Sequence, residues 1–66
     1  MQRLTDAEKQ ICELTAQGLE IKQIAVILSK SEDTVKTQRS SIIRKTGGKN
    51  ITHAVVIFVS KNHSKV

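Results

Sequence analysis

Residues typical of helix starts and helix ends divide this chain into four short segments. Thr5 is followed three residues later by Glu8, which is the pattern of a capping box at a helix start. Ser31 can cap another helix start, and Gly18 and the glycine pair at 47–48 stand where helices commonly end. This spacing predicts an all-α domain built from short helices.

Apolar residues recur at helical spacing between these positions, with Ile11 and Leu14 in the first segment and Ile24, Ala25 and Leu28 in the second. The expected helices run from Thr5 to about Gln17, from Ile21 to Leu28, from Ser31 to about Lys45 and from Asn50 to about Ser60. We expect them to form one domain over residues 1–60, followed by a polar tail at 61–66 that frays.

The run Ala54–Val59 leaves two interpretations open, because its β-branched and aromatic residues are also typical of a strand. The Asn50 cap and the three preceding helices favour a fourth helix. Such a helix is apolar nearly all the way round and needs two buried faces, more than a domain of 66 residues can cover. We predict that Ala54, Ile57 and Phe58 face the first and third helices.

The charge of the chain indicates the class of its partner. Lys and Arg number 11 against six Asp and Glu, which gives a formal net charge of +5 and favours a polyanion such as nucleic acid. An anionic membrane surface would fit the charge, but no segment pairs a cationic face with bulky interfacial anchors. No stretch approaches the ~18 apolar residues of a membrane span, and the N-terminus lacks the apolar core of a secretory signal. We expect a cytoplasmic protein without a membrane partner.

The chain offers no arrangement typical of an enzyme or a metal site. Cys12 has no second thiol, and together with His53 and His63 it shows no metal-ligand spacing. No nucleophile can be combined with a base and an orienting group, and no glycine-rich phosphate loop follows a strand. We expect no enzyme activity, no metal and no cofactor. Cys12 is interpreted as core filler rather than a redox sensor, and the histidines as ordinary side chains rather than pH switches.

The third expected helix carries the pattern that most concerns function. At about 100° per residue, short polar and basic side chains fall within one arc, whereas Val35, Ile42 and Thr46 fall on another side. We call this arc the polar face; it consists of Asp33, Lys36, Thr37, Ser40 and Arg44. Such a face can approach DNA bases and phosphates, although the same pattern suits a merely solvated helix side. A short helix, a three-residue turn and a longer cationic helix favour a helix-turn-helix.

Several short motifs together make the chain similar to a known family. They are LT..E at 4–8, QGL at 17–19, IA at 24–25, S..TVKT at 31–37, RK at 44–45 and KN at 49–50. With these motifs the chain resembles the LuxR-type (NarL/FixJ, GerE-like) helix-turn-helix domains of bacterial transcription regulators. The resemblance implies a four-helix fold whose third helix contacts DNA in the major groove and whose fourth helix forms a homodimer contact.

The resemblance also assigns roles to single residues. Those implied to contact DNA bases are Lys36, Thr37 and Ser40, and those implied to contact the DNA backbone are Lys22, Thr34, Arg39 and Arg44. A lysine ammonium can donate to guanine acceptors, and a threonine methyl can meet a thymine methyl. The implied dimer interface is the second apolar stripe of the fourth helix, Thr52, Val55, Val56 and Val59. A two-fold dimer predicts an inverted-repeat site with half-sites centred roughly 10 base pairs apart.

Five positions depart from the pattern of the family. Gln38 stands where histidine is common, Ser40 is shorter than a frequent lysine, and Ile51 replaces a usual arginine. Thr46 replaces a core leucine and Gly48 replaces a β-branched or aliphatic residue. The change at Ser40 leaves the target sequence open, and Thr46 with Gly48 predicts a looser junction before the fourth helix.

A helical protein-interaction module that binds another regulator instead of DNA is the alternative function. Such a surface would be enriched in aromatic or aliphatic side chains, whereas the polar face has neither and the chain has a single aromatic, Phe58. We therefore expect sequence-specific binding of double-stranded DNA by a bacterial transcription regulator at the nucleoid. If this domain is part of a longer chain, the resemblance implies a receiver or a ligand-sensing domain on its N-terminal side.

Overall fold

Four helices, and no strand, form the secondary structure of the computed structural model, which describes residues 2–62. They are α1 (Asp6–Ala16), α2 (Ile21–Leu28), α3 (Glu32–Thr46) and α4 (Ile51–Asn62). The all-α fold class is confirmed, and so is the helical interpretation of residues 54–59. α4 ends two residues beyond the expected Ser60, with Lys61 in its last turn where the helix dipole favours a cation. The remainder of the expected tail, residues 63–66 with His63, lies outside the described residues.

The capping side chains predicted for α1 and α3 are confirmed. Thr5 Oγ1 accepts a hydrogen bond from the backbone N–H of Glu8 at 3.1 Å, and Glu8 Oε1 accepts one from the backbone N–H of Thr5 at 2.8 Å. At the start of α3, Ser31 Oγ accepts a hydrogen bond from the backbone N–H of Thr34 at 3.1 Å. Each helix therefore begins where its free amides find an acceptor within one turn.

The other two helices also begin at local caps. At α4, Asn50 Oδ1 accepts from the backbone N–H of His53 at 2.8 Å, as the Asn50 cap predicted. His53 Nδ1 in turn accepts a hydrogen bond from the backbone N–H of Lys49 at 3.0 Å, so this histidine has a structural role at the start of α4. At α2, the backbone N–H of Glu20 donates to Gln23 Oε1 at 2.9 Å, a cap that the sequence analysis did not identify.

The turn between α2 and α3 is short and well defined. Ser29 adopts the left-handed conformation with φ 56, and the backbone N–H of Lys30 donates to the carbonyl of Ala25 at 2.9 Å. The Ser31 cap starts α3 directly afterwards. A short helix, this turn and the longer α3 thus form the expected helix-turn-helix unit.

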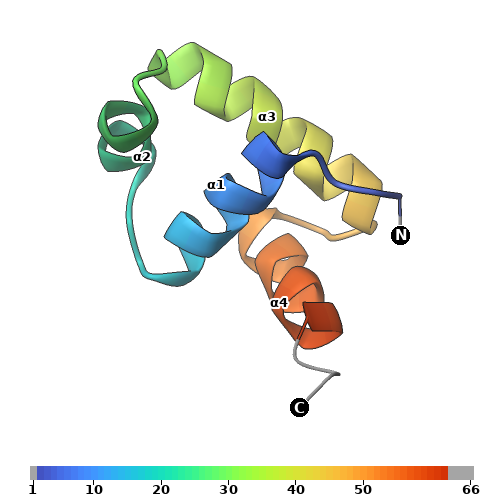
Figure 1. Ribbon diagram of the computed structural model, residues 1–66. Coiled ribbons are helices and arrows are strands. Elements are labelled where there is room, and N and C mark those ends of the chain that lie inside the picture. Colours follow the sequence, from blue (N-terminus) through green and yellow to red (C-terminus); the bar gives the residue numbers. More distant parts are fainter. Residues whose placement is uncertain (1, 63–66) are drawn as a thin grey trace.

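All four helices contribute to one core. α3 runs across the top of the view in Figure 1, with α2 on the left, α1 in the middle and α4 below. The largest of the fully buried side chains come from the first three helices: Ile11, Cys12, Ile24, Val35 and Ile42. Burying one such aliphatic side chain stabilises a fold by about 1.5–3 kcal/mol. The core positions predicted for Cys12, Val35 and Ile42 are confirmed.

The inward-facing side of α4 is confirmed for Ala54 and Phe58 and differs from the prediction at one position, where Val55 takes the place of Ile57. Ala54, Val55 and Phe58 are buried, at 0%, 7% and 7% exposure. Ile57 is half-buried and is not part of the core cluster, so the prediction that it faces inward is wrong. The physical reason is that α4 packs against both α1 and α3, and this packing selects the side of an almost uniformly apolar helix.

The junction between α3 and α4 is tight, so the prediction of a looser junction is wrong. Thr46 Oγ1 donates to the carbonyl of Ile42 at 2.9 Å and accepts from the backbone N–H of Gly48 at 3.2 Å. Gly47 ends α3 in the left-handed region with φ 78. A Cβ atom on Gly48 would lie 2.8 Å from the backbone nitrogen of Ala54. The missing side chain lets the loop approach α4 closely instead of loosening it.

Candidate nucleic-acid interface

The polar face of α3 is exposed along its length. On the buried side, Val35 and Ile42 are both 0% exposed and anchor the helix in the core. The exposed side chains are those of the polar face: Asp33, Lys36, Thr37, Ser40 and Arg44. Beyond Asp33 the helix has no acidic residue. The structure thus brings the residues predicted to contact bases, Lys36, Thr37 and Ser40, together on one accessible surface.

An open concavity of about 540 Å³ lies beside the polar face, where α2, α3 and the start of α4 meet. We call it the basic concavity because Lys22 of α2 lines it together with Lys36 and Arg39 of α3. Lys36 and Arg39 also line a smaller hollow of about 240 Å³ with Ser40. Two residues predicted to contact the DNA backbone, Lys22 and Arg39, therefore lie around one hollow next to a predicted base contact.

Two carboxylates partly offset the positive charge of the basic concavity. Glu20 and Glu32 line it as well, so its lining side chains carry three positive and two negative charges. Glu20 and Glu32 precede or begin helices α2 and α3, where the helix dipole favours negative charge. The three cations reach this hollow from the two helices of the helix-turn-helix unit.

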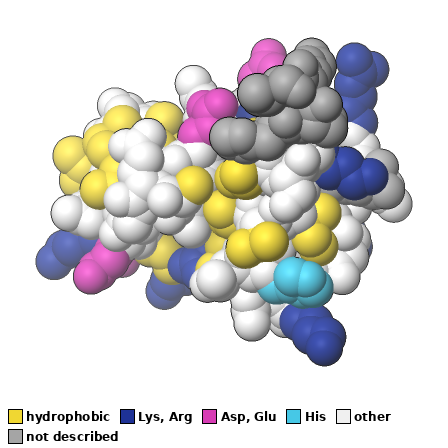
Figure 2. Space-filling model, turned by 90° about the horizontal axis from the view of Figure 1, so that it is seen from below, with side chains coloured by type: hydrophobic (Ala, Val, Ile, Leu, Met, Phe, Trp, Pro, Cys, Tyr) yellow, Lys and Arg dark blue, Asp and Glu magenta, His cyan; other side chains and the backbone are white. Residues whose placement is uncertain are grey.

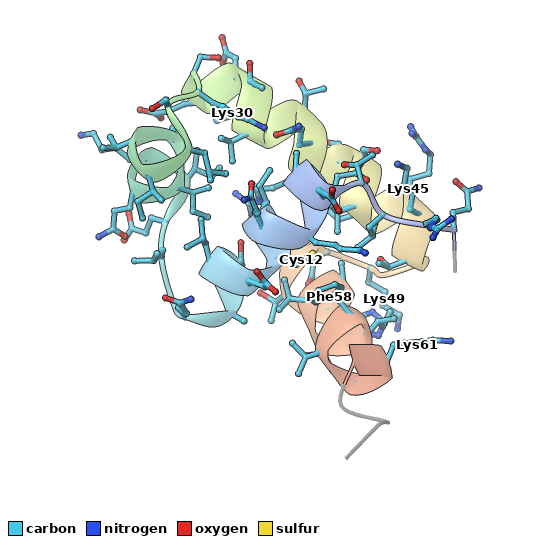
Figure 3. All side chains as sticks on the ribbon, viewed as in Figure 1. Cys12, Lys30, Lys45, Lys49, Phe58 and Lys61 are labelled. Atoms are coloured by element: carbon cyan, nitrogen blue, oxygen red, sulfur yellow. The ribbon has the colours of Figure 1, made fainter. Side chains whose placement is uncertain are left out.

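A further cation lies on the opposite flank of the polar face. Lys30 Nζ donates to Gln38 Oε1 at 3.2 Å, which holds this lysine of the turn against α3 (Figure 3). Helical geometry places Gln38 and Arg39 on opposite flanks of the polar face. An ammonium has three donors, and among residues 2–61 no carboxylate lies within ion-pair distance of Lys30. Sequence reasoning missed Lys30, since the only hint was the departure at Gln38.

The two adjacent cations near the end of α3 have different surroundings. The Arg44 side chain is exposed and donates a long hydrogen bond, 3.5 Å, to Ser41 Oγ. Lys45 instead forms an ion pair with Glu8, and its side chain is 18% exposed. Thr34, also predicted to contact the DNA backbone, is exposed in the first turn, where its Oγ1 accepts from Ser31 Oγ at 2.8 Å. Of the two cations, Arg44 is the one available to a partner.

The four residues predicted to form the dimer interface line one groove of about 430 Å³ between the end of α1 and α4. We call it the α4 groove; its lining is Thr15, Ala16, Thr52, Val55, Val56, Val59 and Ser60. Val56 is 56% exposed, whereas Val55 is buried in the core of its own chain. Thr52 is exposed and Val59 half-buried. Little of Val55 is therefore available to a second copy, and Val56 offers the largest apolar contact.

Hydrophobic side chains gather over α4 and, separately, over α2 when the molecule is seen from below (Figure 2). On α2, Val26 and Ile27 are 75% and 54% exposed, and with Leu19 they line a shallow apolar hollow. These residues do not belong to the polar face. The sequence does not indicate that they are exposed, because α2 has only eight residues and its apolar pattern does not determine which of its sides faces solvent.

The Cys12 thiol is fully buried in this fold. Burial raises its pKa to about 11, with a smaller contribution from the negative charges of Glu8 and Glu13. The thiolate that reacts with oxidants is therefore scarce at neutral pH, in agreement with a core role. Among the described residues, no group of three His, Cys, Asp or Glu side chains is placed to hold a metal ion.

Comparison with known proteins identifies related regulators. The family model described as "Bacterial regulatory proteins, luxR family" matches residues 2–58. The chain is 41% identical over 59 residues to "Transcriptional regulatory protein YdfI" of Bacillus subtilis (strain 168), which covers 89% of this chain and 28% of that protein. It is 36% identical over 58 residues to "Nitrate/nitrite response regulator protein NarP" of Escherichia coli (strain K12), which covers 88% and 27%. The chain thus spans little more than a quarter of the length of either relative.

Within residues 2–62, no helix is long and apolar enough to cross a membrane.

Proposed function

Because the chain belongs to the luxR family of bacterial regulatory proteins, we propose that it binds double-stranded DNA sequence-specifically and regulates transcription. The observation that supports this most directly is the exposed polar face of α3, with cations on both of its flanks. A major groove about 12 Å wide admits one α-helix, and the phosphates of the two strands then lie on either side of it. The cations on each flank of the polar face can therefore contact the phosphates of the strand on that side.

In this arrangement the middle of the polar face contacts base edges. Lys36 donates to guanine acceptors, while Thr37 and Ser40 are short enough to let the helix backbone come close. Lys22 and Arg39 contact phosphates on one flank. Thr34 and Arg44 contact the DNA backbone from the two ends of α3, and Lys30 of the preceding turn contacts it as an addition to the predicted set.

We further propose that a second copy of the chain docks on the α4 groove when both copies occupy DNA. Val56 is 56% exposed at the surface of this groove, and a two-fold contact would bury it against its counterpart. The apolar surface is small, so the dimer is weak in solution and is strengthened by DNA. The target is then an inverted repeat with half-sites centred roughly 10 base pairs apart.

The relatives that match this chain are several times longer, and one of them is named a response regulator. We therefore propose that a receiver or ligand-sensing domain controls this DNA-binding domain if it is part of a longer protein, which acts at the nucleoid in the bacterial cytoplasm. The exposed Val26 and Ile27 on α2 favour a second candidate function, a contact with another regulatory protein.

Selection of bound sequences from random duplex DNA tests the proposal. The parent should enrich an inverted repeat, and Lys36→Ala should lose about 1–3 kcal/mol of binding free energy and relax the preference at one or two base pairs. Lys9→Ala is the matched control, because Lys9 is an exposed lysine of α1 that lines neither hollow beside α3. If Lys36→Ala weakens specific and random DNA equally, Lys36 does not contact bases. A parent that enriches no sequence would support the protein-contact function instead.

A further inference from the structure

We propose that Gly48 is a positioning residue that fixes α4 relative to the polar face of α3 and so sets the spacing of DNA half-sites that the dimer accepts. This inference rests on the proposed function, in which the polar face contacts DNA and the α4 groove receives a second copy. The observation behind it is the close approach of Gly48 to the first turn of α4.

The space beside Gly48 is filled by backbone atoms. A Cβ atom at this position would lie 2.8 Å from the nitrogen and 2.9 Å from the Cα of Ala54, and 3.1 Å from its Cβ. Backbone atoms cannot rotate away as the end of a flexible side chain can. Gly47, the neighbouring residue, has no such atom within 4 Å. Any side chain at position 48 must therefore displace either the loop or the first turn of α4.

The loop itself is held on both sides. The backbone N–H groups of Gly47 and Gly48 donate to the carbonyl of Ile43 at 3.0 and 3.2 Å. Thr46 Oγ1 accepts a second contact from the Gly48 N–H at 3.2 Å. Toward α4, the backbone N–H of Lys49 donates to His53 Nδ1 at 3.0 Å. With these hydrogen bonds in place, a displacement at Gly48 is passed on as a change in the position of α4 relative to α3.

The start of α4 borders the basic concavity, but the three cations of that concavity belong to α2 and α3, so such a change affects DNA recognition chiefly through the dimer. Val56 follows Ala54 by two residues on α4, and the polar face precedes Gly48 on α3. In a two-fold dimer the same shift occurs in both copies, so the two polar faces move relative to each other by the sum of both shifts. Successive nucleotides along one strand lie about 3.4 Å apart, so a modest rotation of α4 is enough to change the preferred spacing.

The experiment compares Gly48→Ala with Gly18→Ala on two kinds of duplex. One kind carries a single half-site taken from the selected sequence, and the other carries two inverted half-sites whose separation varies in steps of one base pair. Gly18 has φ +91 and nothing within 4 Å of its missing Cβ, so an alanine there strains the backbone but crowds no neighbour. Both variants are first checked for helical circular dichroism.

We expect Gly48→Ala to bind the single half-site within about twofold of the parent. At the spacing that the parent prefers, its cooperative occupation of two half-sites should fall by about fivefold or more, since coupling between sites typically amounts to factors of 5–150. Gly18→Ala should keep the preferred spacing of the parent. Adding Ala54→Gly to Gly48→Ala should not restore it, because the nearest atoms belong to the backbone.

A second variant covers the case in which Gly48→Ala does not fold. Thr46→Val replaces by a methyl group of similar size the hydroxyl that hydrogen-bonds the loop to α3. We expect this variant to accept a broader range of spacings at unchanged half-site affinity. An unchanged spacing preference in whichever variant folds overturns the role of Gly48. A parent that occupies two half-sites independently at every spacing overturns the dimer of the proposed function together with this inference. Failure of the parent to enrich any sequence from random duplex DNA overturns DNA binding itself.

Discussion

Lys45 Nζ lies 2.8 Å from Glu8 Oε1 and joins the last turn of α3 to the first turn of α1. The same oxygen accepts the backbone N–H of Thr5 at 2.8 Å, so one atom both caps α1 and fixes the end of α3. Burial by itself raises the pKa of Glu8. The hydrogen bonds from Lys45, Thr5 and Ser41, together with the charge of Lys45, outweigh burial and lower this pKa to about 2.

We expect this carboxylate to make the domain sensitive to acid. A carboxyl whose folded pKa lies below its unfolded value, 4.5, stabilises the fold above that value and loses this contribution as the pH falls toward 2. Between about pH 5 and pH 2, the free energy of unfolding of the parent should fall by up to about 3 kcal/mol more than that of Glu8→Gln. Urea unfolding followed by circular dichroism measures this difference. Parallel pH profiles for the two proteins would contradict it.

The neighbouring cations Arg44 and Lys45 should behave differently when replaced. Lys45→Met leaves Glu8 buried without its partner, and we expect a loss of about 3 kcal/mol in the free energy of unfolding. Arg44→Ala should leave stability within about 0.5 kcal/mol of the parent, because this side chain is exposed. It should instead weaken DNA binding. Thermal unfolding and DNA titration of both variants test whether Lys45 serves stability and Arg44 serves DNA binding. A Lys45→Met protein as stable as the parent would contradict this assignment.

Binding should be strongly dependent on salt, with about three to five phosphate contacts per monomer and a slope of roughly 0.9 in log K per contact. If Lys30 contacts a phosphate, Lys30→Ala should lower the magnitude of this slope by about 0.9. The free energy of unfolding should change little, because among the described residues its ammonium makes a single hydrogen bond, to Gln38. Fluorescence anisotropy at several salt concentrations gives the slopes.

Lys9→Ala serves as the charge-matched control for this experiment, since it removes the same charge from α1. It should leave the slope close to that of the parent. Equal slopes for Lys30→Ala and Lys9→Ala would remove Lys30 from the interface, and binding of the parent that does not respond to salt would contradict the electrostatic contribution altogether.

Aspartate substitutions on α4 separate the core from the proposed dimer contact. Val56 is 56% exposed, so Val56→Asp should fold normally but lose cooperative occupation of two half-sites. Val55 is 7% exposed, so Val55→Asp buries a charge and should unfold the domain. Circular dichroism and titration of paired half-sites give both readouts. A Val56→Asp protein with full cooperativity would place the dimer contact elsewhere.

The sequence predicts the helices well because their ends are determined locally. Thr5, Ser31 and Asn50 each cap a helix with an acceptor used within one turn, and a pattern of that range is visible in the chain. The buried side of α3 could be predicted for the same reason, since Val35 and Ile42 contrast with polar neighbours.

Features that depend on how the helices pack could not be predicted. Residues 54–59 of α4 are apolar nearly all the way round, so the sequence cannot distinguish Val55, which is buried, from Ile57, which is half-buried. The ion pair of Lys45 joins residues 37 positions apart, and nothing in the local pattern of either indicates it. At Gly48 the sequence predicts a looser junction, whereas the absence of a side chain permits a close contact with α4.

The local character of the helix caps also has a kinetic consequence. Each helix can begin to form with an acceptor from its own first turn, before any distant part of the chain has arrived. Small helical domains dominated by contacts of this kind fold in microseconds to milliseconds. A copy that unfolds between encounters with DNA should therefore refold on the same time scale.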